Sequence, residues 1–204
     1  MPVKTKERRL RGLFREIERG WGRVHKGSGH KRDGKPLVYG SGPANARVMV
    51  IGEAPGRDET RQGTPFVGRA GGFFVEILED VFKMKRGDFY ITNVVKVWPT
   101  IETKRLKTRP PHDDEVGFFL PCLGKEVKIV SPKAIIAAGK TAFKALFPSE
   151  DFTPYKWFRS EGGVPVMPVY HPAYILRKQK EIKKNLSVLK TALKKVRSMV
   201  LRDC

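Results

Sequence analysis

Four short apolar segments, each bounded by polar, Gly or Pro residues, constrain the fold of this chain more than any other feature of its sequence. These segments are Val48–Ile51, Phe89–Val95, Ala134–Ala138 and Val164–Val169. Apolar runs of this length are typical of buried strands. The last segment contains two prolines, and because proline cannot donate a ladder hydrogen bond, we expect that strand at an edge of the sheet.

Between and beyond these segments, apolar residues recur at steps of three and four, which predicts helices. The predicted helices cover residues 4–24, 69–85, about 113–131, 140–147 and 178–202. The predicted loops include residues 25–35 and 98–112. Short strands that alternate with helices predict a parallel sheet with crossover helices on both faces. We therefore expect a three-layer α/β/α fold with a central, mainly parallel four-stranded sheet.

We expect residues 1–204 to form a single domain, because the sequence shows no internal repeat and no break in composition between two parts. Within it, residues 1–35 would form an N-terminal helix and a basic loop, and residues 178–202 would form a basic C-terminal helix.

The net charge points to a polyanionic partner. Lys and Arg together number 41 and Asp and Glu 21, so the formal net charge is +20. Such an excess concentrates polyanions at a protein surface. A solvated, solubilising surface would also account for it, but nucleic acid is the partner that the charge favours.

Several classes of protein are excluded. The chain has no run of 18 apolar residues, so we expect no membrane-spanning helix and no membrane partner. The first residues are charged, with no apolar stretch behind them, which argues against a secretory signal. Cys122 and Cys204 are too few for a disulfide framework or a four-thiolate metal site. We expect an intracellular, cytoplasmic and nucleoid-associated monomer.

The carboxyl ends of the predicted strands indicate where a ligand would bind, because parallel sheets hold their ligands there. This rule selects three loops: residues 52–72, 93–112 and 170–177. Glu53, Asn93 and His171 stand at or near these strand ends. A carboxylate can hold a water or stabilise a cation, an amide matches the edge of a base, and an imidazole can donate to a leaving group. Taken singly, each also fits a structural role.

Two further motifs do not support a function. Gly139-Lys140-Thr141 resembles the end of a phosphate-binding loop, but that loop needs a glycine where this chain has Ala134. Pro121-Cys122 resembles part of a zinc deaminase signature, but the second cysteine and the preceding His-x-Glu are missing.

Four motifs in this order resemble the family 4 uracil-DNA glycosylases, from about Val38 to the terminal helix. They are Gly52-Glu-Ala-Pro-Gly56, Gly63-Thr-Pro-Phe-Val-Gly-Arg-Ala-Gly71, Ile91-Thr-Asn-Val-Val-Lys96 and His171-Pro-Ala-Tyr-Ile-Leu-Arg177. The resemblance implies the uracil-DNA glycosylase fold and an enzyme that flips uracil out of DNA, hydrolyses its N-glycosidic bond and leaves an abasic site.

The resemblance also implies roles for single residues. Glu53 and His171 would be catalytic, the first beside the attacking water and the second stabilising the departing uracil anion at O2. Phe66 would stack on the base and Asn93 would read its N3 and O4 edge. The further substrate-binding positions would be Gly52, Ala54 and Pro55.

The resemblance implies DNA contacts on two loops. The segment from His171 to Arg177 would press into the duplex, with Pro172, Tyr174 and Arg177 as contacts. An insertion of about six residues after Lys96 bears Lys104, Arg105, Lys107 and Arg109, which we expect at the DNA backbone, although a solvated loop is also open. A sister group traps DNA covalently through a His in this loop; this loop has none before His112, so we expect turnover.

The chain departs from the family at its iron–sulfur cluster. By spacing from the motifs, the four cysteine ligands fall on His25, Ser28, Val97 and, approximately, Phe119. Without thiolates such a cluster has no site. We therefore expect a variant with no cofactor and no metal, in which side-chain packing holds this region, with Trp98 and Phe119 as candidates.

The expected partner is DNA containing uracil, single- or double-stranded. Two alternatives stay open: a glycosylase for another deaminated base, hypoxanthine or xanthine, and a non-catalytic DNA-binding protein of the same fold.

Overall fold

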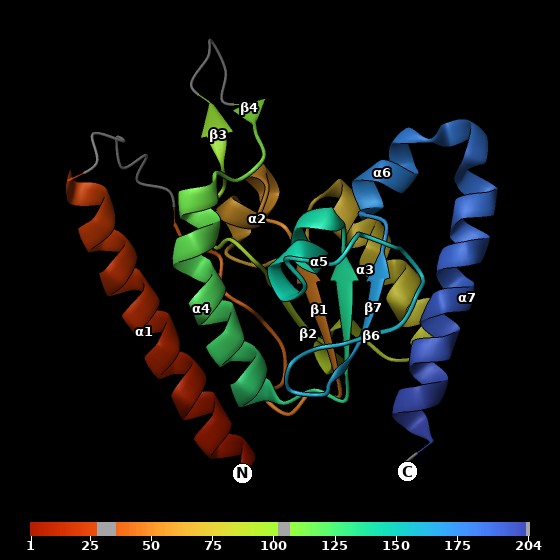
Figure 1. The fold of residues 1–204 in the computed structure, drawn as a ribbon, viewed down its shortest axis with the longest axis horizontal. Coiled ribbons are helices and arrows are strands. Elements are labelled where there is room, and N and C mark those ends of the chain that lie inside the picture. The colour runs from red at the N-terminus through yellow and green to blue at the C-terminus, as the bar shows by residue number, and fades with distance from the viewer. Residues whose placement is uncertain (28–35, 102–106, 203–204) are drawn as a thin grey trace.

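The computed structural model describes residues 1–27, 36–101 and 107–202, with the side chains of residues 24–27 left aside. Its central sheet has the strand order β2-β1-β5-β7-β6 (Figure 1). The strands are β1 (Val48–Gly52), β2 (Tyr90–Asn93), β5 (Ala134–Ala138), β6 (Phe158–Arg159) and β7 (Pro165–Val169). The first three and β7 run parallel, and β6 runs antiparallel to β7.

Helices cover both faces of this sheet. The α-helices are α1 (Val3–Gly27), α2 (Arg57–Gln62), α3 (Arg69–Phe82), α4 (Asp113–Val130), α5 (Lys140–Leu146), α6 (Pro172–Arg177) and α7 (Ile182–Leu201). Two short 3-10 turns lie at η1 (Arg86–Asp88) and η2 (Gln179–Glu181). One apolar core joins α3, α6 and α7 to the sheet, and a second joins α1, α4 and α5 to its other face.

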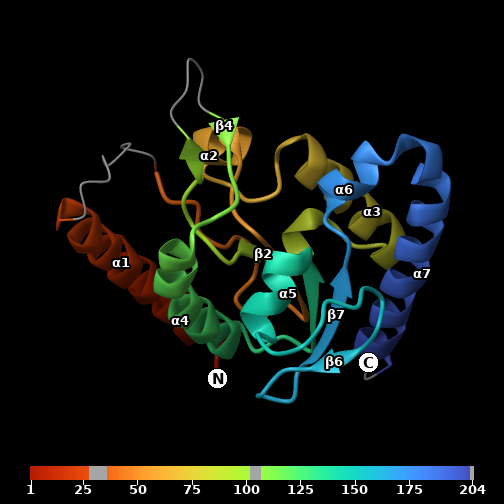
Figure 2. The same ribbon diagram turned by 45° about the horizontal axis from the view of Figure 1, so that its top comes forward.

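The three-layer arrangement predicted from the sequence is confirmed. Figure 2 shows α1 beside α4 on one side of the sheet and α7 beside α3 on the other. Every residue of β1 and β5 is buried, because both faces of these central strands are covered. This burial explains why these strands read as continuous apolar runs rather than as alternating patterns.

The strand count and one strand position differ from the prediction. The sheet has five strands, not four, because the short β6 pairs with β7. The prediction of β7 at an edge is therefore wrong. The register pairs Phe158 with Val166 and Arg159 with Pro165, so the two-residue β6 ends before Pro168 is reached. A proline is tolerated there because β6 offers it no partner.

Other differences are local. The stretch 98–112, predicted as loop, contains a two-stranded hairpin of β3 (Thr100–Ile101) and β4 (Lys107–Thr108). The first helix runs to Gly27, so residues 25–27 are helical and not part of the predicted loop. The segment 172–177, predicted as loop, is the helix α6, with Pro172 at its first position, where a missing N–H costs nothing. Among the described residues, no helix is long and apolar enough to cross a membrane.

Candidate active site

The ends of the parallel strands bring the predicted site residues into one pocket. Gly52, at the end of β1, is in register with Asn93, at the end of β2. His171 lies two residues after the end of β7. A pocket of about 290 Å³ opens at this edge. Its lining includes Glu53, Ala54, Pro55, Phe66, Asn93, His171 and Pro172. The pocket is near the lower end of the size range for small-molecule sites, on the order of 300 Å³.

Gly52 allows the amide of Asn93 and the ring of Phe66 to lie close to the end of β1. A Cβ at this position would lie 2.4 Å from Oδ1 of Asn93 and 2.7 Å from the ring of Phe66. Real Cβ contacts are never that short, so the amide and the ring converge here only because residue 52 has no side chain. Asn93 itself is 2% exposed. The backbone N–H groups of Val94 and Val95 donate to the oxygens of Gly52 (2.9 Å) and Glu53 (3.0 Å), which locks the two strand ends together.

The carboxylate of Glu53 is oriented by α5. The hydroxyl of Thr141, in the first turn of that helix, donates to Oε2 of Glu53. Glu53 is half-buried and lines the pocket. A carboxylate held in this way keeps its negative charge at a fixed place beside a bound ligand.

His171 is held as a neutral donor. It caps the N-terminus of α6, and its Nδ1 accepts the backbone N–H of Ala173 at 3.2 Å. A ring nitrogen that accepts a hydrogen bond carries no proton, so in the neutral ring the proton is on Nε2. Burial lowers the pKa of His171, and the negative charge of Glu53 only partly opposes this effect. The imidazole is therefore neutral near pH 7 and presents an N–H donor.

Gly139 makes room for this imidazole. It follows β5 with φ of +101°, a conformation that glycine adopts without strain. A Cβ here would lie 3.1 Å from Cβ of His171. The end of β5 therefore lies so close to His171 that a side chain at position 139 would require the imidazole to shift by a few tenths of an ångström.

The loop that carries Phe66 is fixed by two charged side chains. Phe66 has φ of +57°, the left-handed region that costs a non-glycine residue about 1–2 kcal/mol. The guanidinium of Arg86 donates to the backbone oxygens of Pro65 and Phe66, the second at 3.4 Å. The carboxylate of Glu59 accepts the backbone N–H groups of Gly56, Val67 and Gly68 at 3.0, 3.1 and 2.7 Å. These contacts hold the strained turn that places the Phe66 ring in the pocket.

The predicted DNA contacts lie at several places. Lys104 and Arg105 fall outside the described residues. The guanidinium of Arg109 forms two hydrogen bonds with the carboxylate of Glu115, at 2.6 and 2.8 Å. This ion pair is nearly buried, at 16% and 9% side-chain exposure, so Arg109 fastens the hairpin to α4. Its contact with DNA stays a prediction.

On α6, Pro172 is buried and lines the pocket, and Arg177 is exposed at the end of the helix. The ring of Tyr174 stacks on Tyr170 at 4.8 Å between centroids, with the ammonium of Lys178 6.0 Å from its centroid. These residues lie on or next to a helix beside the pocket, and not on the loop that the sequence predicted.

Two of the four positions expected for cluster ligands carry side chains that cannot bind an iron–sulfur cluster. Val97 is 9% exposed and Phe119 is fully buried, and both belong to the apolar core on the side of α1 and α4. Neither side chain can bind iron. Trp21 packs on Phe119 with ring centroids 4.7 Å apart. The side chain of His25 and the whole of Ser28 lie outside the described residues. Among the described residues, no group of three or more His, Cys, Asp or Glu could hold a metal.

Sequence reasoning missed four residues that build the site: Glu59, Arg86, Gly139 and Thr141. The Gly139-Lys140-Thr141 motif was a signal for two of them, since it stands at a strand end, although it does not form a phosphate-binding loop. Glu59 and Arg86 gave no signal, because a charged side chain that binds backbone groups leaves no periodic pattern.

The fold, with its pocket at the carboxyl ends of β1, β2 and β7, is that of a known superfamily. The sequence pattern of the uracil DNA glycosylase superfamily matches residues 39–197, and the chain belongs to this superfamily.

Within the superfamily, the chain is similar to type-4 enzymes. It is 32% identical to a type-4 uracil-DNA glycosylase of Sulfurisphaera tokodaii over 174 residues, 80% of this chain and 74% of the relative. It is 38% identical to a type-4 uracil-DNA glycosylase of Pyrobaculum aerophilum over 154 residues, 71% of this chain and 75% of the relative. A type-5 uracil-DNA glycosylase of the same organism is 31% identical over 150 residues, 65% of this chain and 63% of the relative.

Proposed function

We propose that this protein is a uracil-DNA glycosylase that flips uracil out of DNA and hydrolyses its N-glycosidic bond. The supporting observation is the single pocket that gathers Glu53, Phe66, Asn93 and His171 in a member of the uracil DNA glycosylase superfamily. Flipping costs a few kcal/mol, least for a mispaired base such as uracil opposite guanine. The net charge of +20 offsets this cost by attracting the DNA backbone.

In the proposed complex, the base stacks on Phe66 and its edge faces the amide of Asn93. An amide offers one donor and one acceptor group, which match O4 and N3–H of uracil. The N–H at Nε2 of His171 donates to O2, where negative charge grows as the glycosidic bond breaks. One such donor in a site that excludes water contributes about 3 kcal/mol to the transition state.

The proposed reaction breaks the bond between C1′ of the sugar and N1 of uracil, and both electrons stay on N1. The carboxylate of Glu53 stabilises the positive charge that develops at the sugar. A water oxygen then bonds to C1′, and Glu53 accepts a proton from that water. The products are the uracil anion and an abasic site. Thr141 keeps the carboxylate in place through its hydrogen bond to Oε2.

We further propose that the protein is similar to type-4 enzymes but holds no iron–sulfur cluster. The whole chain has two cysteines, and two of the four ligand positions carry Val97 and Phe119. Aromatic packing around Trp21 and Phe119 fills the core at the second of these positions. Iron analysis and an absorbance spectrum of the purified protein test this proposal. A broad absorbance band in the visible range with stoichiometric iron would contradict it.

We also propose a monomer that binds uracil in single- or double-stranded DNA inside the cell, in association with the nucleoid. Lys104, Arg105 and Arg109 would contact the DNA backbone, and Pro172, Tyr174 and Arg177 on α6 would press into the duplex. Binding of one protein per short oligonucleotide, measured by sedimentation, would support this arrangement. A stable dimer on DNA would exclude it.

Uracil release tests the proposed function. The purified protein is incubated with single-stranded and U·G duplex oligonucleotides, followed by alkaline cleavage at abasic sites. We expect cleavage with the parent protein and cleavage slower by at least about a hundredfold with Glu53→Gln. Matched oligonucleotides with hypoxanthine or xanthine test the other bases. DNA binding without cleavage of any of these substrates would indicate a non-catalytic binding protein instead.

A further inference from the structure

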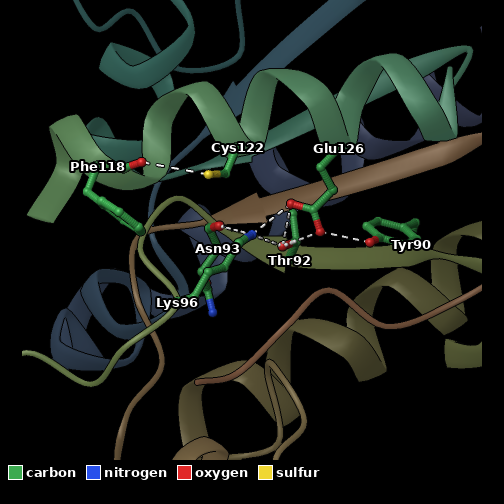
Figure 3. A network of polar contacts seen from close by, with 7 residues as sticks. All are labelled: Tyr90, Thr92, Asn93, Lys96, Phe118, Cys122 and Glu126. Carbon is green, nitrogen blue, oxygen red and sulfur yellow. Dashed lines mark hydrogen bonds and ion pairs between the residues drawn. The ribbon is translucent and has the colours of Figure 1, made fainter. Parts of the chain in front are cut away.

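A fully buried ion pair lies directly beneath Asn93 and takes no part in the proposed reaction. The ammonium of Lys96 is 2.7 Å from Oε2 of Glu126, and the two side chains are 0% and 1% exposed. Lys96 follows β2 by three residues and Glu126 lies on α4, so the pair joins the end of an edge strand of the sheet to the helix that covers it (Figure 3).

The hydrogen bonds of this pair are complete. The ammonium of Lys96 donates to Oγ1 of Thr92 at 2.5 Å, to the backbone oxygen of Asn93 at 2.7 Å and to Glu126. These three bonds use all three of its protons. The hydroxyls of Tyr90 and Thr92 donate to Glu126, at 2.7 and 3.2 Å. Burial and the charge of Glu126 raise the pKa of Tyr90, so its hydroxyl keeps the proton that it donates.

Stability alone does not account for a buried pair of charges. Removing two charges from water is costly, and apolar residues of the same volume are often as stabilising or more so. The backbone group that the pair holds in place explains this cost better. Of the three groups that Lys96 contacts, one is the backbone oxygen of the residue that lines the base pocket.

The segment around Asn93 is therefore fixed from two sides. On one side, the N–H groups of Val94 and Val95 bond to β1 and to Glu53. On the other side, Lys96 binds the Asn93 carbonyl. Together these contacts fix the peptide plane that follows Asn93, and with it the direction in which the side-chain amide leaves the backbone. Figure 3 shows Asn93 and Lys96 side by side under α4.

We propose that Lys96 is a positioning residue for uracil recognition, with Glu126 as the counter-charge that lets it stay buried. The pair sets the orientation of the Asn93 amide and thereby the selectivity of the pocket for uracil. This inference rests on the proposed role of Asn93 in reading the base.

The test separates positioning from stability with isosteric variants. Lys96→Met leaves Glu126 buried without a counter-charge, so a large loss of stability is expected. The double variant Lys96→Met with Glu126→Gln is neutral and keeps acceptors for Tyr90 and Thr92, so most of the thermal stability should return. Tyr90→Phe is the matched control, because it removes a hydrogen bond to Glu126 without touching Asn93.

Two measurements are made well below the unfolding temperature: inhibition by free uracil, and kcat/KM for uracil relative to hypoxanthine. In the double variant the inhibition constant for uracil should rise about tenfold, which corresponds to the loss of one charge-assisted hydrogen bond. The selectivity for uracil over hypoxanthine should fall. Tyr90→Phe should keep the parent values of both. A double variant that regains parental uracil inhibition together with its stability would overturn the inference.

Asn93→Ala distinguishes the two levels of the argument. If Asn93→Ala weakens uracil inhibition and the double variant does not, the positioning role is wrong and the proposed role of Asn93 stands. If Asn93→Ala also keeps the parental inhibition constant, the proposed role of Asn93 fails and the inference fails with it.

Discussion

Glu59 gives the most direct test of how the pocket is built. Its carboxylate accepts three backbone N–H groups: Oε2 binds Gly56, and Oε1 binds Val67 and Gly68. Hydrogen bonds to a charged group contribute about 1.5–3 kcal/mol each when buried. Glu59 is only partly buried, so about 1 kcal/mol per bond is the appropriate scale for the loop that carries Phe66.

Two substitutions weaken the hydrogen bonds of Glu59 to different extents. Glu59→Gln keeps one acceptor oxygen and loses the bond to Gly56, at a cost of about 1 kcal/mol. Glu59→Ala loses all three bonds, at a cost of about 3 kcal/mol. Because Phe66 has a left-handed backbone, its turn should relax when these bonds are absent, and the ring should leave the pocket. A misplaced stacking surface should lower kcat/KM for uracil release about tenfold in the Gln variant and about a hundredfold in the Ala variant.

The assay is single-turnover uracil release together with thermal unfolding. Asp80→Asn is the control at an acid outside the pocket lining, because Asp80 is exposed and pairs with the exposed side chains of Lys83 and Lys190 at 3.1 and 2.7 Å, and such pairs contribute little. If Glu59→Ala releases uracil as fast as Asp80→Asn, the carboxylate does not hold the loop and the reasoning fails.

Four further predictions concern the same site. Glu53→Gln should lower kcat at least a hundredfold while binding of uracil-containing DNA survives, since an amide keeps the shape but not the charge; a parental rate would remove Glu53 from the mechanism. Gly52→Ala should weaken inhibition by free uracil and destabilise the protein by about 1–3 kcal/mol, because the new Cβ collides with Asn93 and Phe66; unchanged inhibition and melting temperature would contradict the close approach. By NMR, with His171→Asn for assignment, His171 should titrate below 6.5, since burial lowers its pKa. Between that value and 6.5 only the unfolded chain binds the proton, so the contribution of His171 to stability should grow as pH rises through this window; a titration above 6.5 would refute the neutral donor. Added salt should weaken DNA binding steeply and leave free-uracil inhibition almost unchanged, and equal salt dependence of both would contradict the separation of the two interactions.

The sequence was sufficient to predict the layers of the fold and the core of the site. Strands buried on both faces are continuous apolar runs, and the residues that follow them lie at one edge of a parallel sheet. Glu53, Asn93 and His171 could be placed together for this reason alone. The strand β6 could not, because two residues carry no period, and neither could the β3–β4 hairpin.

What the sequence could not supply were the contacts between distant segments. Thr141 reaches Glu53 across 88 positions of the chain, and Glu126 reaches Lys96 across 30. A lysine after a strand is typical of an exposed position, and only the acid on another helix permits its burial. The chemical groups of the site are therefore local in sequence, whereas the groups that orient them are not.

The charges of the molecule divide into two functions. The net charge of +20 is spread over the chain and attracts any polyanion, without regard to sequence. The pocket, by contrast, is lined by three acids, Glu53, Asp58 and Glu59, as well as by Arg57 and Arg69. In the proposed reaction the carboxylate of Glu53, which accepts the hydroxyl of Thr141, attracts the positive charge that develops at the sugar, by Coulomb attraction over a few ångströms. In the proposed complex the basic surface therefore attracts the DNA backbone and Glu53 stabilises the cationic sugar, so that affinity and chemistry depend on opposite charges.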